Sequence, residues 1–217
     1  MKPGRPSEPA KGCAAVRSAR SPAVDPSGRN VKPIHPVPVK LFSGILYTDG
    51  ACLQKALGIL SSRFGTIDFA SRDFPFDQTD YYHSEMGSPI ARRFVSFEPL
   101  VQPDEIARIK IACNGIEEDL ATGGRRRVNL DPGYMDFDKV VLASAKYNGD
   151  KIYLQDGIWG DLTLRYKFKH FEPYPWSFPD FKSGAYLEVF DSIRRIYKRQ
   201  MKQGGIKKEL DNQEICD

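Results

Sequence analysis

Long apolar runs and cysteine pairs are missing from the sequence, and each absence argues against a class of protein. No segment has the roughly 20 consecutive apolar residues that a transmembrane helix needs, and none resembles the apolar core of a signal peptide. We therefore expect no membrane partner. The four cysteines are scattered without a C-x-x-C pair. Their pattern argues against a disulfide framework or a zinc site and favours a reducing cytoplasm.

An excess of one charge sign is also missing from most of the chain. The formal charge is +4, but residues 1–38 carry seven basic and two acidic side chains, a net of +5. The remainder therefore has a charge of −1, which disfavours nucleic acid as a partner but leaves it as an alternative. Residues 1–38 also hold eight of the 16 prolines. We predict a disordered, basic, proline-rich tail over residues 1–37.

Apolar periodicity predicts one α+β domain over residues 38–203, followed by a frayed tail over 204–217. Its first six elements follow the order strand, helix, strand, strand, helix, strand, which is the split β-α-β arrangement of ferredoxin-like domains. They are expected at residues 39–48, 50–64, 66–71, 91–100, 103–122 and 125–130. Strands at 139–147, 151–155 and 159–168 then extend the sheet as an antiparallel meander, and a C-terminal helix is expected at 184–202.

The segment GGRRRVNLDPGYMD concentrates candidate ligand-binding side chains. On a strand, Arg125 and Arg127 share one face with Asn129 and Asp131, while Arg126 opposes them. This polar face is either the wall of a site or the solvent side of the sheet, and burial of Asn129 distinguishes the two.

Asp131-Pro132-Gly133-Tyr134 is typical of a tight turn, because proline presets the second position and glycine tolerates a positive φ at the third. The alternative is functional: Asp131 acts as a general base or a metal ligand near the arginines. Tyr134 is a further candidate ligand contact.

Arg92 and Arg93 also lie on opposite faces of a predicted strand. If this strand lies beside the 125–130 strand, one arginine from each can form a bidentate anion site. The alternative is that these arginines pair with surface carboxylates.

The loop RDFPFDQTDYYHSEMGSP offers oxygen and nitrogen donors that suit a divalent metal. The weak metal candidates are Asp80, His83 and Glu85, whose spacing matches no known ligand motif. Tyr82 either anchors the loop or contacts a ligand.

Two further features have both a structural and a functional interpretation. Ser144 and Lys146 share one strand face, as a solvated pair or as a Ser-Lys nucleophile. The segment FEPYPWSFPDF is a rigid strap over the sheet, or a wall for a flat ligand with Trp176 stacking on it.

Four runs together resemble a known family: TDYYHSEMG (79–87), RRRVNLDPGYMDFDKVVLASAKY (125–147), IYLQDGIWGDLTLRY (152–166) and FEPYPWSFPDFKS (171–183). They are similar to the bacterial domain-of-unknown-function family 4416, and the resemblance covers about residues 38–200. It implies a soluble, single-domain prokaryotic protein and assigns no catalytic residue or cofactor. Some members are labelled GTP-binding, whereas this sequence lacks the G-x-x-x-x-G-K-[ST] phosphate loop.

The function that these observations favour is a small-molecule site, in a binding protein or an enzyme, for an anionic or nucleotide-like ligand. Polar and aromatic loops beside a sheet are where such sites usually lie. One alternative is a nucleic-acid-binding module that stacks bases on an open sheet face. Another is a protein-interaction module that uses the basic C-terminal helix and exposes an apolar strip there.

Overall fold

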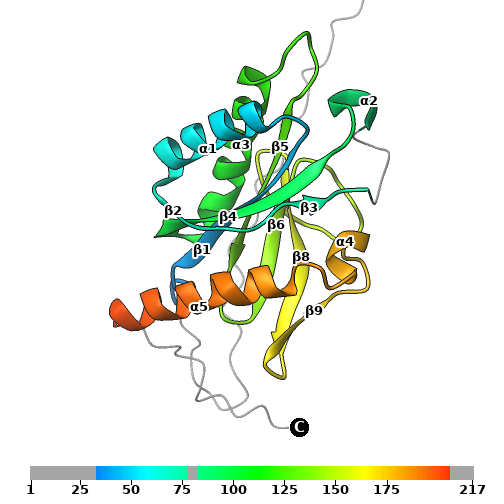
Figure 1. The fold of residues 1–217 in the computed structure, drawn as a ribbon. Coiled ribbons are helices and arrows are strands. Elements are labelled where there is room, and N and C mark those ends of the chain that lie inside the picture. The colour runs from blue at the N-terminus through cyan, green and yellow to red at the C-terminus, as the bar shows by residue number, and fades with distance from the viewer. Residues whose placement is uncertain (1–32, 78–82, 206–217) are drawn as a thin grey trace, which may run out of the picture. The chain divides into compact units, whose positions relative to one another are not determined.

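The computed structural model describes residues 33–77 and 83–205, and these residues form an α+β fold built on one antiparallel sheet of nine strands (Figure 1). The strands are β1 (Val39–Tyr47), β2 (Ile67–Ala70), β3 (Phe74–Pro75), β4 (Ala91–Val101), β5 (Val128–Met135), β6 (Lys139–Ser144), β7 (Ile152–Gln155), β8 (Ile158–Lys167) and β9 (His170–Pro173). The helices are α1 (Gly50–Phe64), α2 (His83–Met86), α3 (Ile106–Asp119), α4 (Pro179–Lys182) and α5 (Leu187–Gln203), with a 3-10 turn, η2 (Pro103–Glu105), before α3.

The sheet order β2-β4-β1-β5-β6-β8-β7 confirms the predicted topology. Its first four strands are arranged as in a split β-α-β unit: β4 lies between β1 and β2, and β1 lies between β4 and β5, each pairing antiparallel. Strands β6, β8 and β7 continue the sheet as a meander, β3 pairs with β4, and β9 pairs with β8.

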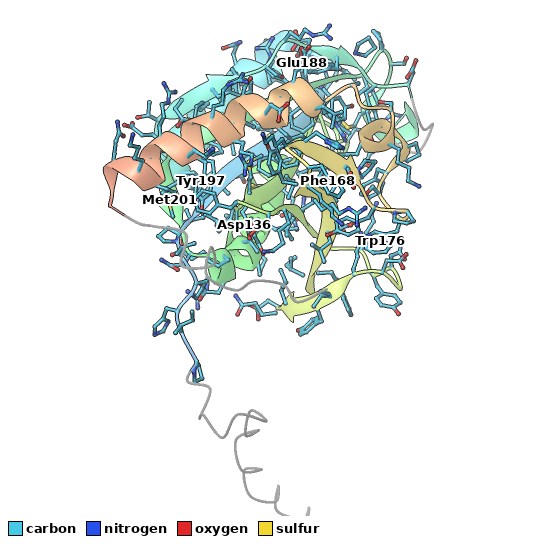
Figure 2. The ribbon with its side chains drawn as sticks, turned by 90° about the horizontal axis from the view of Figure 1, so that it is seen from below. Asp136, Phe168, Trp176, Glu188, Tyr197 and Met201 are labelled. Carbon is cyan, nitrogen blue, oxygen red and sulfur yellow. The ribbon has the colours of Figure 1, made fainter. Side chains whose placement is uncertain are left out.

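The helices divide between the two faces of the sheet (Figures 1 and 2). Helices α1 and α3 bury one apolar core with Leu41 and Ile45 of β1. Helix α5 buries a second core with Phe42, the residue after Leu41, because side chains alternate along a strand. Figure 2 shows Tyr197 and Met201 on the side of α5 that faces the sheet, where both are almost fully buried.

The ends of α1 are set by local chemistry that the sequence indicates. The Asp49 side chain accepts a hydrogen bond from Ala51 N–H at 2.9 Å and so caps the first turn. Gly65 ends the helix with a φ of 100°, which favours glycine.

The predicted turn at Asp131 is wrong. Residues 131–134 lie inside β5, which begins at Val128 and not at Arg125. Asp131 pairs with Gly44 and Tyr134 with Leu41 across β1, so this Asp-Pro-Gly-Tyr segment is extended. Pro132 is tolerated because the partner strand β6 does not pair with this part of β5.

Other boundaries also differ from the predictions. Helix α3 ends at Asp119, before the paired glycines that were expected to stop it. The aromatic loop contains the short strand β3, and the segment FEPYPWSFPDF runs from the end of β9 to the start of α4, with residues 174–178 between them. The predicted tails lie largely outside the described residues and stay predictions. Among the described residues, no helix is long and apolar enough to cross a bilayer.

Strands β5 and β6 form a hairpin in which the two strands separate beyond a short paired segment; we call this separation the fork. They pair only from Gly133 with Leu142 to Met135 with Val140, and the preceding half of β5 has no partner in β6. At the vertex, a Cβ on Gly133 would lie 2.5 Å from the Val141 carbonyl oxygen and 2.7 Å from Cζ of Phe42. Only a glycine therefore allows the two strands to approach as closely as they do.

Gly133→Ala tests this close approach. We expect it to lower the free energy of unfolding by about 1–3 kcal/mol, because the backbone of β6 and the Phe42 ring must move to admit a methyl group. Gly58→Ala is the matched control: Gly58 is an exposed residue inside α1 with no atom near its added Cβ, so we expect stabilisation of about 0.5–1 kcal/mol. Urea denaturation measures both. An unchanged stability of Gly133→Ala would contradict the tight vertex.

Candidate functional site

A cavity of about 840 Å³ lies at the fork between β5 and β6. Its lining comes from β1, β4, α3, β5 and β8, from β6 and the loop after it, from the start of α4, and from Phe76 and Arg126 outside these elements. Its volume lies within the range of ordinary small-molecule sites, about 300–1,000 Å³.

The register of three adjacent strands sets the polar groups on one wall. Leu46 of β1 pairs with Arg92 of β4 on one side and with Asn129 of β5 on the other. Two residues along, Gly44 pairs with Phe94 and Asp131 in the same way. All six therefore share one sheet face, and the missing side chain of Gly44 leaves room between Phe94 and Asp131.

Arg92 is a buried cation with two carboxylate neighbours. One guanidinium nitrogen donates to Asp180, at the start of α4, and another lies 3.6 Å from an oxygen of Asp131. The guanidinium carbon also lies 4.6 Å from the centre of the Phe76 ring. The hydroxyl of Tyr186 donates to the same Asp180 carboxylate at 3.3 Å, and burial raises the pKa of Tyr186 to about 12.

Lys110 and Glu117 of α3 take the place of a sheet partner for β5. The Lys110 ammonium donates to the Leu130 carbonyl oxygen at 2.6 Å, and the Glu117 carboxylate accepts from Leu130 N–H at 2.7 Å. Both side chains are buried, with Nζ of Lys110 3.6 Å from Oε1 of Glu117. The backbone groups exposed by the fork are thus satisfied by charged side chains, and burial raises the pKa of Glu117.

Arg126 connects this pair to Asn129 and to α2. Its guanidinium donates to Glu117 at 3.1 Å and to Oδ1 of Asn129 at 2.9 Å, and it forms a bidentate pair with Glu85. Hydrogen bonding to Arg126 lowers the pKa of Glu85. Because Oδ1 of Asn129 faces Arg126, the amide nitrogen Nδ2 is turned away from it.

Two buried N–H donors of the lining are left without an acceptor among the described residues: Nε of Arg92 and Nδ2 of Asn129. The two residues are only 6% and 4% exposed. Buried donors of this kind are rare in folded proteins and need an acceptor from water or a ligand. The burial of Asn129 decides the alternative left open by the sequence, because this face of β5 lines a cavity and not bulk solvent.

Ser144, Lys151 and Asp161 form a second cluster, on the β6 side of the cavity. Nζ of Lys151 donates to the Ser144 hydroxyl at 2.9 Å and to the Lys146 carbonyl oxygen at 3.2 Å, and lies 3.6 Å from Asp161. Nζ of Lys151 thus donates a hydrogen bond to the Ser144 hydroxyl rather than accepting one from it. Moreover, Ser144 accepts a hydrogen bond from the backbone N–H of Lys146. The cluster does not support the predicted Ser-Lys nucleophile.

The structure brings together three of the predicted ligand-binding residues, Arg92, Asn129 and Asp131, around one cavity. Tyr82 lies outside the described residues. The others lie elsewhere: Arg93, Arg125, Arg127, Tyr134 and Trp176 are absent from the cavity lining.

Each of these five has a different environment. Arg93 forms a bidentate pair with Asp73, and Arg127 lies 3.6 Å from Asp49. Arg125 is exposed before β5, because the strand begins three residues later than predicted. Tyr134 packs against the core under α1 and α3. The Trp176 indole donates to the Leu162 carbonyl oxygen and stacks on Tyr174, while 40% exposed.

The metal candidates are only partly described. Asp80 and the side chain of His83 lie outside the described part of the chain, and Glu85 pairs with Arg126. Within the described ranges, no group of three or more His, Cys, Asp or Glu side chains is placed to hold a metal ion.

Sequence reasoning missed Lys110, Glu117, Arg126, Lys151 and Asp161 as cavity residues. A signal for the first two exists: they are seven residues apart on α3 and follow directly after the apolar positions Ile109 and Ile116. A charged pair two helical turns apart beside an apolar stripe is close to the core boundary. No comparable signal identifies Lys151 or Asp161.

Comparisons with known proteins identify a family and nothing more specific. The model of the family described as Domain of unknown function (DUF4416) matches residues 37–197. Comparison with curated proteins and with solved structures gave no match. The site is therefore interpreted from its own geometry.

Glu117→Gln and Glu117→Leu separate the two roles of this carboxylate. We expect Glu117→Gln to lower the free energy of unfolding by about 1.5–3 kcal/mol, because charged hydrogen bonds are lost while the amide oxygen still accepts from Leu130. We expect about 3–5 kcal/mol for Glu117→Leu, which leaves buried charges uncompensated. Urea denaturation measures both. Equal losses would show that the hydrogen bond to Leu130 contributes nothing.

The raised pKa of Glu117 predicts a pH dependence. The folded state binds this proton more tightly than the unfolded chain, so the contribution of Glu117 to stability falls as pH rises from about 4.5 through the folded pKa. Glutamine has no such proton. We expect the unfolding free energy of the wild type minus that of Glu117→Gln to shrink as pH rises across this window, in urea titrations at several pH values. A difference that grows with pH would contradict the raised pKa.

Proposed function

The chain belongs to the DUF4416 family, and because that family has no defined activity, we propose a function from the cavity: it binds a small molecule that presents an anionic or other acceptor group to Arg92 and Asn129. The protein is then either a small-molecule-binding protein or an enzyme. The observation that carries the proposal is the pair of buried N–H donors in the cavity lining that have no acceptor among the described residues.

The arrangement of charges supports binding of a polar rather than an apolar ligand. Arg92, Lys110, Glu117 and Asp180 are all buried at the cavity, and burial of charges is costly unless pairing or function compensates it. The Asp131 side chain is 29% exposed, more than that of Arg92 or Lys110 beside it. Asp131 is therefore the carboxylate we assign to contact the ligand, and the candidate proton acceptor if the ligand reacts.

The base-stacking version of nucleic-acid binding has less support. It needs an open sheet face, whereas α1 and α3 cover one face of the β2-β4-β1-β5 strands and α5 packs on the other.

A second candidate function, a protein-interaction module that uses α5, is favoured by one observation. Four basic side chains are exposed at spacings of three, one and three residues: Arg195, Lys198, Arg199 and Lys202.

A protein contact at α5 would therefore be electrostatic. The large apolar side chains of this helix, including Phe190, Ile193 and Tyr197, are buried in the core. The exposed strip on α5 is basic rather than apolar, unlike the surface expected from the sequence.

A ligand screen by thermal shift tests the proposed function. Nucleotides, phosphorylated metabolites, amino acids, organic acids and sugars form the panel. A ligand at 100 times its dissociation constant adds about 2.7 kcal/mol to stability, which is a visible shift. We expect Asp131→Asn and Asn129→Leu to abolish the shift given by the true ligand, since both side chains line the cavity.

Arg127→Ala is the matched control, because Arg127 precedes the same strand but does not line the cavity. It should leave the ligand shift unchanged. Circular dichroism verifies that each variant is folded before the screen. A shift that persists in both Asp131→Asn and Asn129→Leu would place the ligand outside this cavity, and a panel without any hit would count against the proposal.

A further inference from the structure

The cavity lining has no net formal charge. Five cationic and five anionic side chains line it, and most of the cations already have a carboxylate partner. Arg92 is held by Asp180, and Lys151 lies against Asp161. Arg126 is also paired with Glu85, which is not a lining residue and adds one further negative charge next to the cavity. A polyphosphate would therefore enter a site whose cations are already neutralised and whose carboxylates repel it.

Asp131 is the lining carboxylate that lies on the same sheet face as Arg92 and Asn129. Its nearest cationic atoms are Nη2 of Arg92 at 3.6 Å and Nζ of Lys110 at 4.0 Å, beyond hydrogen-bond distance. No described residue donates a hydrogen bond to it. Within the described ranges, the wall thus presents an acceptor without a donor, Asp131, beside two donors without an acceptor, Nε of Arg92 and Nδ2 of Asn129.

We infer that the ligand is a zwitterion of the amino-acid class, an inference that rests on the proposed function of the cavity. Its carboxylate accepts hydrogen bonds from Arg92 and Asn129, and its ammonium group donates to Asp131. Such a ligand fills both kinds of unpaired group and adds no net charge to a balanced cavity.

The size and mouth of the cavity indicate which amino acids fit best. Tyr147 and Phe178 line it and are 71% and 47% exposed, so aromatic rings border its opening. A volume of about 840 Å³ exceeds what the polar head alone needs. We expect aromatic and long-chain members to bind more tightly than glycine, because their side chains reach these rings.

Isothermal titration calorimetry with matched probes tests the inference on the full chain. The probes are the 20 free amino acids, the N-acetyl and carboxamide derivatives of each that binds, and ATP as the polyanion. Removing either charge should weaken binding at least tenfold, because one unpaired group of the wall is left unfilled. ATP should give no heat of binding.

Asp131→Asn supplies the reciprocal test. It leaves the shape of the side chain but gives the lining one positive charge, so the preference should reverse: the N-acetyl derivative should bind at least as tightly as the free amino acid. Arg127→Ala should bind all probes as the wild type does. A free amino acid that binds Asp131→Asn as tightly as the wild type would overturn the inference.

The remaining outcomes separate this inference from the proposed function. If ATP, a sugar or a hydroxy acid binds the cavity, with sensitivity to Asn129→Leu, and no amino acid does, the ligand class is wrong and the function of the cavity stands. If none of these probes and no compound of the thermal-shift panel binds, both fail.

Discussion

The separation of β5 from β6 is the constraint on which the cavity depends. A sheet that opens exposes backbone N–H and C=O groups, and these cannot stay buried without partners. Here the partners of Leu130 are the Lys110 ammonium and the Glu117 carboxylate, delivered from α3. A charged pair therefore lies inside the protein. Arg126 completes the hydrogen bonding of Glu117 and also donates to Oδ1 of Asn129. The charged side chains of the cavity are thus needed first as hydrogen-bond partners for the backbone of β5.

The same constraint gives the cavity two different sides, one of paired strands and one of loops. The floor is made by β4, β1 and β5, whose pairing is continuous along the residues that carry Arg92, Gly44 and Asp131. The opposite wall comes from the end of β6, the loop after it and the start of α4, where exposed side chains such as Tyr147 and Phe178 lie. Recognition of a fixed polar head by the floor and of a variable remainder by the loops is a common division in ligand sites on sheets.

The apolar periodicity of the sequence predicts most of the fold, because the apolar faces of β1, α1, β4 and α5 are regular. The ends of these elements also carry signals such as Asp49 and Gly65. The prediction failed at Asp131-Pro132-Gly133-Tyr134, where turn chemistry is strong but the fork removes the partner strand that would have forbidden proline. That error displaced the strand start by three residues and so assigned Arg125 and Arg127 to the polar wall in place of Arg126. Asn129 and Asp131 were placed correctly relative to each other, since their spacing does not depend on where the strand begins. Lys151 and Asp161 meet only through tertiary packing, which no local pattern encodes.

Because Leu46 pairs with both Arg92 and Asn129, the composition of the site depends on the register of three adjacent strands. Side chains alternate across a strand, so a shift of β4 by one position would exchange Arg92 for Arg93, and the same shift of β5 would replace Asn129 by an apolar neighbour. The sheet could keep its hydrogen bonds after such a shift while the wall lost its donors. Natural insertions and deletions are therefore compatible with this cavity in the loops between strands, but an odd-numbered length change within β1, β4 or the first half of β5 is not.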